Sequence, residues 1–143
     1  MLEIGSMQLP KLFHGRVVLG QGRGRRLGFP TANLELPKDF PATAYGVYAC
    51  WVWVGNKWRP GVAHLGPAAS FGEKVPVLEV HILDWTGELN QGLTAQITQK
   101  IRDTAIFSRP EELILQIHHD AMKAARLLRA TTPPDSPPKD FLR

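Results

Sequence analysis

The chain has a single cysteine, Cys50, so an internal disulfide is excluded. Cys50 lies in an apolar stretch, which indicates a buried small side chain in a reducing compartment rather than a nucleophile. The longest apolar run, residues 44–54, is much shorter than the roughly 20 residues that span a bilayer. The N-terminus also lacks the basic-then-apolar order of a signal peptide. The sequence therefore predicts a cytoplasmic protein that does not enter the membrane.

The common phosphate and zinc motifs are also missing. No G-K-[ST] follows a glycine loop, no G-x-G-x-x-G opens a helix, and H-E-x-x-H does not occur. The formal net charge is only +4, and the basic residues form no long run. A charge this mild does not indicate a nucleic-acid partner, and a phosphorylated small molecule explains it equally well.

The chain of 143 residues, 43% of them hydrophobic, is of a size for one domain with one core. We expect residues 1–130 to fold and the proline-rich residues 131–143 to form a flexible tail. Apolar and β-branched patterning predicts strands, with a loop at residues 20–44 and a turn at Gly55-Asn56. The predicted strands are residues 12–19, 45–54, 57–65, 75–83 and 93–101.

A change of period near the end of the chain predicts a helix of about 20 residues. Ser108 and Glu111 have the spacing of a capping box, with Pro110 in the first turn. Several short strands followed by one helix indicate an antiparallel barrel or sandwich with the helix packed against it.

The densest cluster of unusual residues is GRGRRLGFPTANL, residues 22–34. Its glycines let the backbone approach a ligand, and its arginines and N–H groups suit an anion. Thr31 and Asn33 follow in a predicted Pro-Thr-Ala-Asn turn, and their oxygens suit Mg²⁺. This combination fits a nucleoside triphosphate, although a basic surface turn explains the composition equally well.

Glu79 is the most informative carboxylate because it falls in the middle of a predicted strand, on a half-buried sheet. A rigid, partly desolvated carboxylate suits a general base for a hydroxyl. The alternative, favoured by the residues alone, is a solvated glutamate on the outer face. His81 shares that face and is expected to be structural.

Arg102 and Phe107 follow the last predicted strand. They could clamp a phosphate and stack on a planar ring, or be a surface arginine and a core phenylalanine.

Four segments in order resemble the riboflavin kinase family over residues 12–129. The first is the loop of residues 22–34, and the second is V-L-E-V-H-I-L-D at residues 77–84. The others are I-R-D-T-A-I-F at 101–107 and S-R-P-E-E-L-I-L-Q-I-H-H-D at 108–120. The resemblance implies a mainly β fold, a six-stranded antiparallel Greek-key barrel with a C-terminal α-helix packed against it.

The resemblance also implies transfer of the ATP γ-phosphate to the 5′-hydroxyl of riboflavin, giving FMN and ADP, with Mg²⁺ as cofactor. Glu79 matches the catalytic glutamate, and Thr31 and Asn33 match the residues that hold the metal and the nucleotide. The remaining matches to ATP- and flavin-binding positions are Gly20, Gly22, Gly24, Arg25, Arg26, Ile82, Asp84, Arg102 and Phe107.

We expect a monomer whose partners are riboflavin and ATP, without FAD synthesis by this chain. One alternative is a flavin- or nucleotide-binding module of the same fold with weak catalysis. A nucleic-acid-binding barrel is a further alternative, but it would require surface aromatics beside basic strands.

Overall fold

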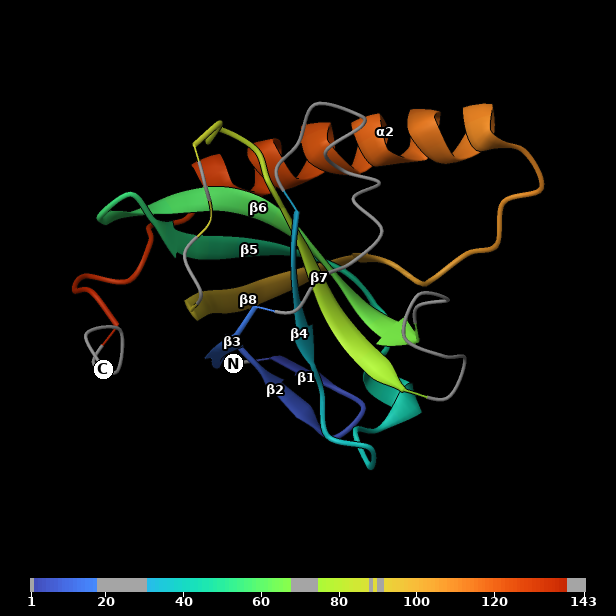
Figure 1. Cartoon of the computed structure of the whole chain (residues 1–143), viewed down its shortest axis with the longest axis horizontal. Coiled ribbons are helices and arrows are strands. Elements are labelled where there is room, and N and C mark those ends of the chain that lie inside the picture. The colour runs from blue at the N-terminus through green and yellow to red at the C-terminus, as the bar shows by residue number, and fades with distance from the viewer. Residues whose placement is uncertain (1, 18–30, 68–74, 88, 90–91, 139–143) are drawn as a thin grey trace.

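A curled antiparallel sheet forms the body of the molecule, and one long helix lies across its outer face (Figure 1). The computed structural model describes residues 2–17, 31–67, 75–87, 89 and 92–138. Six strands pair in the order β3-β8-β5-β6-β7-β4. They are β3 (Lys11–Arg16), β4 (Thr31–Glu35), β5 (Gly46–Val54), β6 (Lys57–Pro67), β7 (Pro76–Ile82) and β8 (Gly92–Arg102). The helix is α2 (Pro110–Arg129), and the predicted mainly β fold with a C-terminal helix is confirmed.

The β5–β6 hairpin is the centre of the sheet and has the predicted turn. Gly55 and Asn56 both have positive φ, at 64° and 61°, and Val54 pairs with Lys57 around them. Two successive positive φ values match the strand twist that a two-residue hairpin needs. The predicted strand of residues 57–65 is longer in the structure, because β6 continues to Pro67, opposite Pro76 at the start of β7.

β5 is buried on both faces because the molecule has two apolar cores. Tyr48, Cys50 and Val52 point into the first core, inside the curl of the sheet. Val47 and Ala49 point into the second, between the sheet and α2. The predicted burial of Cys50 is confirmed. Desolvation raises the pKa of the Cys50 thiol far above its usual range.

Residues 20–44 were predicted to form a loop, and for residues 31–44, which the structure describes, this prediction is wrong. Thr31–Glu35 forms β4 instead of a turn, and Ala42–Ala44 forms the short 3₁₀ helix η1. Alternation explains β4, because Ala32 and Leu34 enter the inner core.

Two further strands, β1 (Leu2–Ile4) and β2 (Met7–Leu9), form an N-terminal hairpin that the sequence analysis did not predict. The hairpin lies on the side of the sheet away from α2 (Figure 1). Met7 and Leu9 are buried and belong to the inner core. The hairpin therefore helps to close the curl of the sheet.

α2 has the predicted length, but its first turn differs from the predicted capping box. Arg109, not Ser108, is the N-cap residue, and it makes no side-chain cap hydrogen bond. The cause is Pro110 at the first helical position, because a residue before proline is pushed to extended backbone. Arg109 accordingly has φ −136° and ψ 142°.

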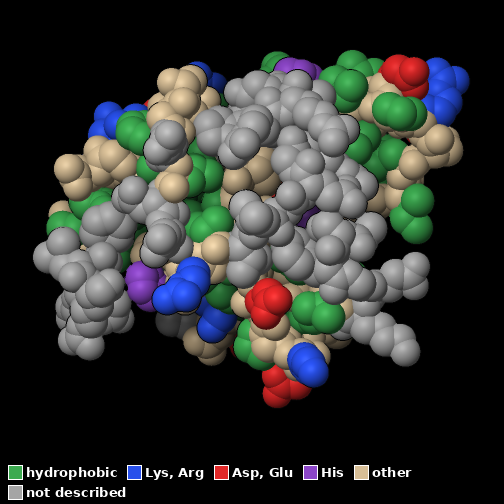
Figure 2. Space-filling model, viewed as in Figure 1, with side chains coloured by type: hydrophobic (Ala, Val, Ile, Leu, Met, Phe, Trp, Pro, Cys, Tyr) green, Lys and Arg blue, Asp and Glu red, His purple; other side chains and the backbone are tan. Residues whose placement is uncertain are grey.

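The first turns of α2 extend beyond the sheet. The first residue of α2 to be buried is Ile117, whereas Ile114 and Leu115 are exposed. Figure 2 shows hydrophobic side chains beside charged ones at this end of the molecule. Within the described part of the chain, no helix combines the length and apolar character needed to cross a membrane.

A hydrogen bond joins the described part of the segment after α2 to the sheet. The indole Nε1 of Trp58 donates a hydrogen bond of 3.1 Å to the backbone oxygen of Ser136. This contact ties part of the predicted tail to the β5–β6 hairpin.

Candidate active site

A row of side chains crosses the sheet on the face that α2 covers. Asn33 on β4 lies opposite Glu79 on β7, and Glu79 lies opposite His64 on β6. His64 is opposite Val47 on β5, which pairs in turn with Arg102 on β8. Directly opposed residues of antiparallel strands point to the same face. We call Asn33, Glu79, His64 and Arg102 the polar row.

A register shift lets β8 contribute to this face twice. The shift lies between Val47 and Tyr48, which pair with Arg102 and Lys100. The extra residue, Ile101, packs in the second core, between the sheet and α2, which we call the outer core. Arg102 reaches α2 itself. A β-bulge commonly redirects a side chain in this way.

Glu79 is held by a histidine from its own strand. His81 Nε2 and Glu79 Oε1 are 3.2 Å apart, and the two residues are spaced so that both point to the α2 face. The Glu79 side chain is 27% exposed and that of His81 10%. Thr31 lies directly opposite His81 in the ladder. The structure thus brings the predicted base together with both predicted metal ligands.

Asn33 carries the clearest sign of an incomplete site. The residue is 3% exposed, and its Oδ1 has no hydrogen-bond partner among the described residues. A buried carbonyl oxygen without a partner costs about 1–3 kcal/mol, so such atoms are rare. An amide oxygen and a nearby threonine hydroxyl are hard donors, and Mg²⁺ prefers hard oxygen donors. Asn33 and Thr31 therefore fit a magnesium ion.

His64 lies between Glu79 and Arg102 in the polar row. Burial lowers the pKa of the His64 imidazole, since desolvation disfavours its charged form. The neighbouring charges act in both directions: Glu79 and Asp120 raise this pKa, whereas Arg102 and His81 lower it. The balance favours a neutral imidazole beside the Glu79 carboxylate.

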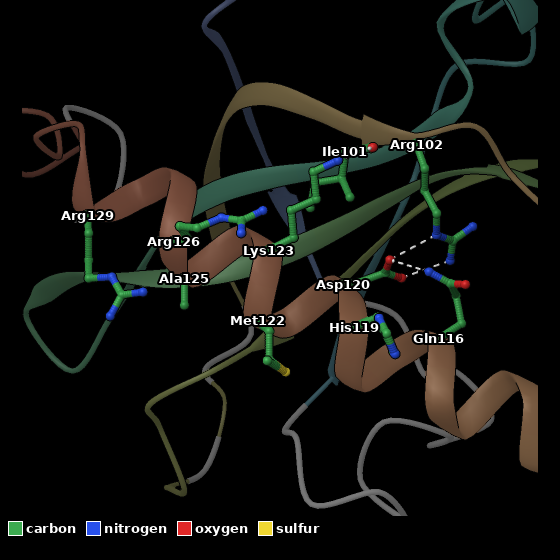
Figure 3. Close-up of a pocket in the computed structure, with 10 residues that line it drawn as sticks. All are labelled: Ile101, Arg102, Gln116, His119, Asp120, Met122, Lys123, Ala125, Arg126 and Arg129. Carbon is green, nitrogen blue, oxygen red and sulfur yellow. Dashed lines mark hydrogen bonds and ion pairs between the residues drawn. The ribbon is translucent and has the colours of Figure 1, made fainter.

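Arg102 is committed to the helix. Its Nε and Nη2 donate to the two carboxylate oxygens of Asp120 at 2.9 and 2.8 Å, and its Nη1 donates to the backbone oxygen of Asp103 at 3.0 Å. Gln116 donates a further hydrogen bond of 3.0 Å to Asp120 (Figure 3). Asp120 is only 4% exposed. These contacts make Arg102 a tie between β8, α2 and the chain that follows β8.

An open groove of about 570 Å³ adjoins this ion pair between α2 and the end of β8 (Figure 3). Basic side chains dominate its lining. The lining residues are Ile101, Arg102, Gln116, His119, Asp120, Met122, Lys123, Ala125, Arg126 and Arg129.

Three other predicted ligand-binding residues lie in the described part of the chain. None of them is beside Glu79 on its face of the sheet. Phe107 is half-buried, with its ring centroid 5.9 Å from the Arg102 guanidinium carbon. Ile82 is fully buried in the inner core, on the opposite face of β7 from Glu79. Asp84 lies beyond the end of β7, where Arg59 is 3.8 Å from its carboxylate. Only Phe107 is tied to the polar row by a described contact.

Five predicted binding residues lie outside the described part of the chain. They are Gly20, Gly22, Gly24, Arg25 and Arg26. Their assignment to the phosphate loop stays a prediction.

Asp120 and His64 were missed by the sequence analysis. Asp120 had a usable signal, because it falls three residues after Ile117 and four before Ala124 on the buried stripe of α2. A carboxylate on an apolar stripe requires a partner. His64 had no such signal, since its place opposite Glu79 depends on the register between β6 and β7.

Comparisons with known proteins identify the family of the chain. The sequence model of the flavokinase family, described as riboflavin kinase, matches residues 7–128. The chain is 36% identical over 126 residues to the bifunctional riboflavin kinase/FMN adenylyltransferase of Escherichia coli K12, covering 87% of this chain and 40% of the relative. The chain thus spans about two fifths of the length of the bifunctional relatives that it matches.

Two solved structures share the fold. Riboflavin kinase from Trypanosoma brucei superposes with a TM-score of 0.61 at 22% identity, covering 95% of this chain and 94% of that one. A structure titled macrolide-efflux protein from Streptococcus pneumoniae superposes with a TM-score of 0.67 at 29% identity, covering 81% and 38%.

The curled antiparallel sheet with the long helix across it is the fold of a flavokinase-type domain, which a solved riboflavin kinase shares. The match of the family model over residues 7–128 makes the assignment specific. The chain belongs to the riboflavin kinase family.

Proposed function

We propose that this chain transfers the γ-phosphate of ATP to the 5′-hydroxyl of riboflavin, giving FMN and ADP. Family membership supports the substrates and the reaction. The observation that carries the assignment to this site is the pairing of Glu79 with Asn33, whose buried oxygen has no partner among the described residues. A carboxylate beside a hard oxygen donor suits phosphoryl transfer with a divalent cation.

Glu79 is the general base of the proposed reaction. Its carboxylate accepts the hydroxyl proton as the substrate oxygen bonds to the γ-phosphorus, and the bond from that phosphorus to the β–γ bridging oxygen breaks. Its partial burial favours this role, because it limits the water that competes with the substrate hydroxyl for the carboxylate. Its place on a strand fixes its position better than a loop would.

Mg²⁺ is the proposed cofactor, with Asn33 and Thr31 as its protein ligands. Bound there, it would neutralise charge on the transferred phosphate. Gly20, Gly22, Gly24, Arg25 and Arg26 are proposed to cover the phosphates, with Ile82 and Asp84 beside the adenine. Phe107 is proposed to contact the flavin, with Arg102 beside it.

The proposed working form is a monomer that acts on small molecules and not on nucleic acid or membranes. We place the reaction in the cytoplasm because ATP is the phosphoryl donor. The alternative is a binding module with weak catalysis. The presence of Glu79, Asn33 and Thr31 on one face argues against it.

The direct test is to incubate the purified chain with riboflavin, ATP and Mg²⁺ and to separate flavins by chromatography. We expect FMN and ADP in equal amounts, with no FMN when ATP or the metal is omitted. Tight binding of riboflavin without any FMN would support the binding module and contradict the proposal.

A further inference from the structure

His81 has no assigned role in the proposed reaction, yet its side chain contacts the proposed base. His81 Nε2 is 3.2 Å from Glu79 Oε1. In the ladder, His81 lies between Thr31 on β4 and Val62 on β6. It therefore borders the predicted metal ligands on one side and the apolar outer core on the other.

The surroundings of His81 restrict its movement. The residue is 8% exposed, and its neighbour Val62 belongs to the core beneath α2. A buried ring on the middle of a strand has few available rotamers. By contrast, glutamate has three side-chain torsions and is 27% exposed here, so it needs an external contact to keep one orientation.

The direction of the hydrogen bond follows from the chemistry of the pair. An ionised carboxylate has only acceptors, so Nε2 of His81 carries the hydrogen and donates it to Oε1 of Glu79. This bond fixes one carboxylate oxygen and with it the plane of the group. A catalytic group must hold its geometry to within about 0.5 Å, and outer contacts that set such geometry are commonly worth 10- to 100-fold in activity.

We infer that His81 is a positioning residue for the base: its Nε2–H group holds the Glu79 carboxylate in the orientation that receives the substrate proton. The inference rests on the proposed function and assigns His81 a part in that reaction. His81 itself neither contacts the substrate nor exchanges a proton with it.

Two amide variants separate positioning from bulk structure. In His81→Gln the amide nitrogen is the same number of bonds from Cβ as Nε2 is in histidine, so it reaches Glu79. In His81→Asn the amide is one bond shorter and does not reach. Both variants are polar, uncharged and smaller than histidine, so each is the matched control of the other. His118→Gln, at an exposed position of α2 outside the groove lining, controls for loss of a histidine away from the site.

Steady-state rates of FMN formation provide the first readout. We expect kcat to fall about 10- to 100-fold in His81→Asn and to stay within about 3-fold of the parent in His81→Gln. The KM values for riboflavin and ATP should change by less than about 2-fold in both, because His81 acts on the base and not on substrate binding. Equal kcat losses in the two variants, or a loss confined to KM, would contradict the inference.

The second readout asks whether His81 acts through Glu79. In a Glu79→Gln background, the His81→Asn change should cost no further activity, because the group that it positions is already gone. An additional 10-fold loss in that background would overturn the inference. If the parent forms no FMN, the proposed function fails; if the parent is active and His81→Asn equals it, only this inference fails.

Discussion

At the scale of single residues, Asn33 is the side chain that points most clearly to a bound ligand. Its amide is buried and directly opposite Glu79, and Oδ1 has no partner in the described part of the chain. The remaining contacts of the fold must compensate for the cost of an unpaired buried polar atom. Such costly features concentrate at functional positions.

Asn33→Leu tests whether this oxygen serves function and not stability. Leucine is similar in size and removes the unpartnered acceptor, so we expect the free energy of unfolding to fall by no more than about 1 kcal/mol. FMN formation should drop at least about 10-fold, with the largest deficit at low Mg²⁺. Urea unfolding and an FMN assay across metal concentrations measure the two effects. A variant that is much less stable and fully active would contradict this assignment.

His64 gives the fold a pH dependence. Its pKa in the folded protein is below the ordinary value of about 6.5, chiefly because of burial. The unfolded chain therefore binds this proton first as the pH falls, and stability present above about pH 6.5 is progressively lost below it. We expect His64→Gln to reduce the slope of unfolding free energy against pH between about 6.5 and 5. An unchanged slope would show that other groups cause the acid sensitivity.

At the scale of elements, the Arg102–Asp120 pair fastens α2 to the edge of the site. Arg102 closes the polar row, and Asp120 lies on the buried stripe of the helix. The same guanidinium holds the backbone of Asp103 and lies near the ring of Phe107. The helix and the segment leading to Phe107 therefore share one anchor.

Asp120→Ala leaves the Arg102 guanidinium, 23% exposed, without its carboxylate. Removing one member of a largely buried ion pair is costly, and we expect a loss of about 2–3 kcal/mol in unfolding free energy. The KM for riboflavin should rise, since Phe107 loses its anchor. Asp103→Ala is the control, because that side chain is exposed and its backbone oxygen stays in place. Equal unfolding midpoints for parent and Asp120→Ala would contradict the anchor.

The elements that could be predicted from sequence are those with a local sequence pattern. The β5–β6 hairpin and α2 were predicted well because a two-residue turn and a helical apolar period are local signals. β4 was missed because its central residue is Asn33, and asparagine is unfavourable in strands. Here Asn33 lies on the face of the sheet that carries the site. Pro110 overrode the apparent capping box, since it fixes Arg109 as extended.

The candidate site divides in the same way. Glu79 stood out because an acid in the middle of an apolar strand is unusual, and family resemblance pointed to Thr31 and Asn33. The polar row could not be predicted, because it depends on the register of five strands that are distant in sequence. The commitment of Arg102 to Asp120 required the packing of α2 on the sheet.

At the scale of the whole molecule, the central strand β5 contributes to both apolar cores. β5 supplies side chains to the core inside the curl and to the core beneath α2, and Cys50 lies at its middle with no exposed surface. Exposing this thiol therefore requires the sheet to open. Its raised pKa further lowers its reactivity while the protein is folded.

Thiol labelling should consequently report global unfolding. We expect the native chain to resist a thiol reagent at pH 8 and to react at a rate that rises with urea in parallel with loss of circular dichroism. Addition of ATP, Mg²⁺ and riboflavin should slow labelling, because ligands that bind the folded state stabilise it. Rapid labelling of the native protein would contradict the burial of β5.

The most direct test of the central claim, that Glu79 is the base on this sheet face, is the rate of FMN formation by Glu79→Gln. Glutamine keeps the shape of the side chain but does not accept the hydroxyl proton. We predict a kcat about 10²- to 10⁴-fold below that of the parent, with KM values for riboflavin and ATP close to the parent values. A Glu79→Gln variant that forms FMN as fast as the parent would contradict the account.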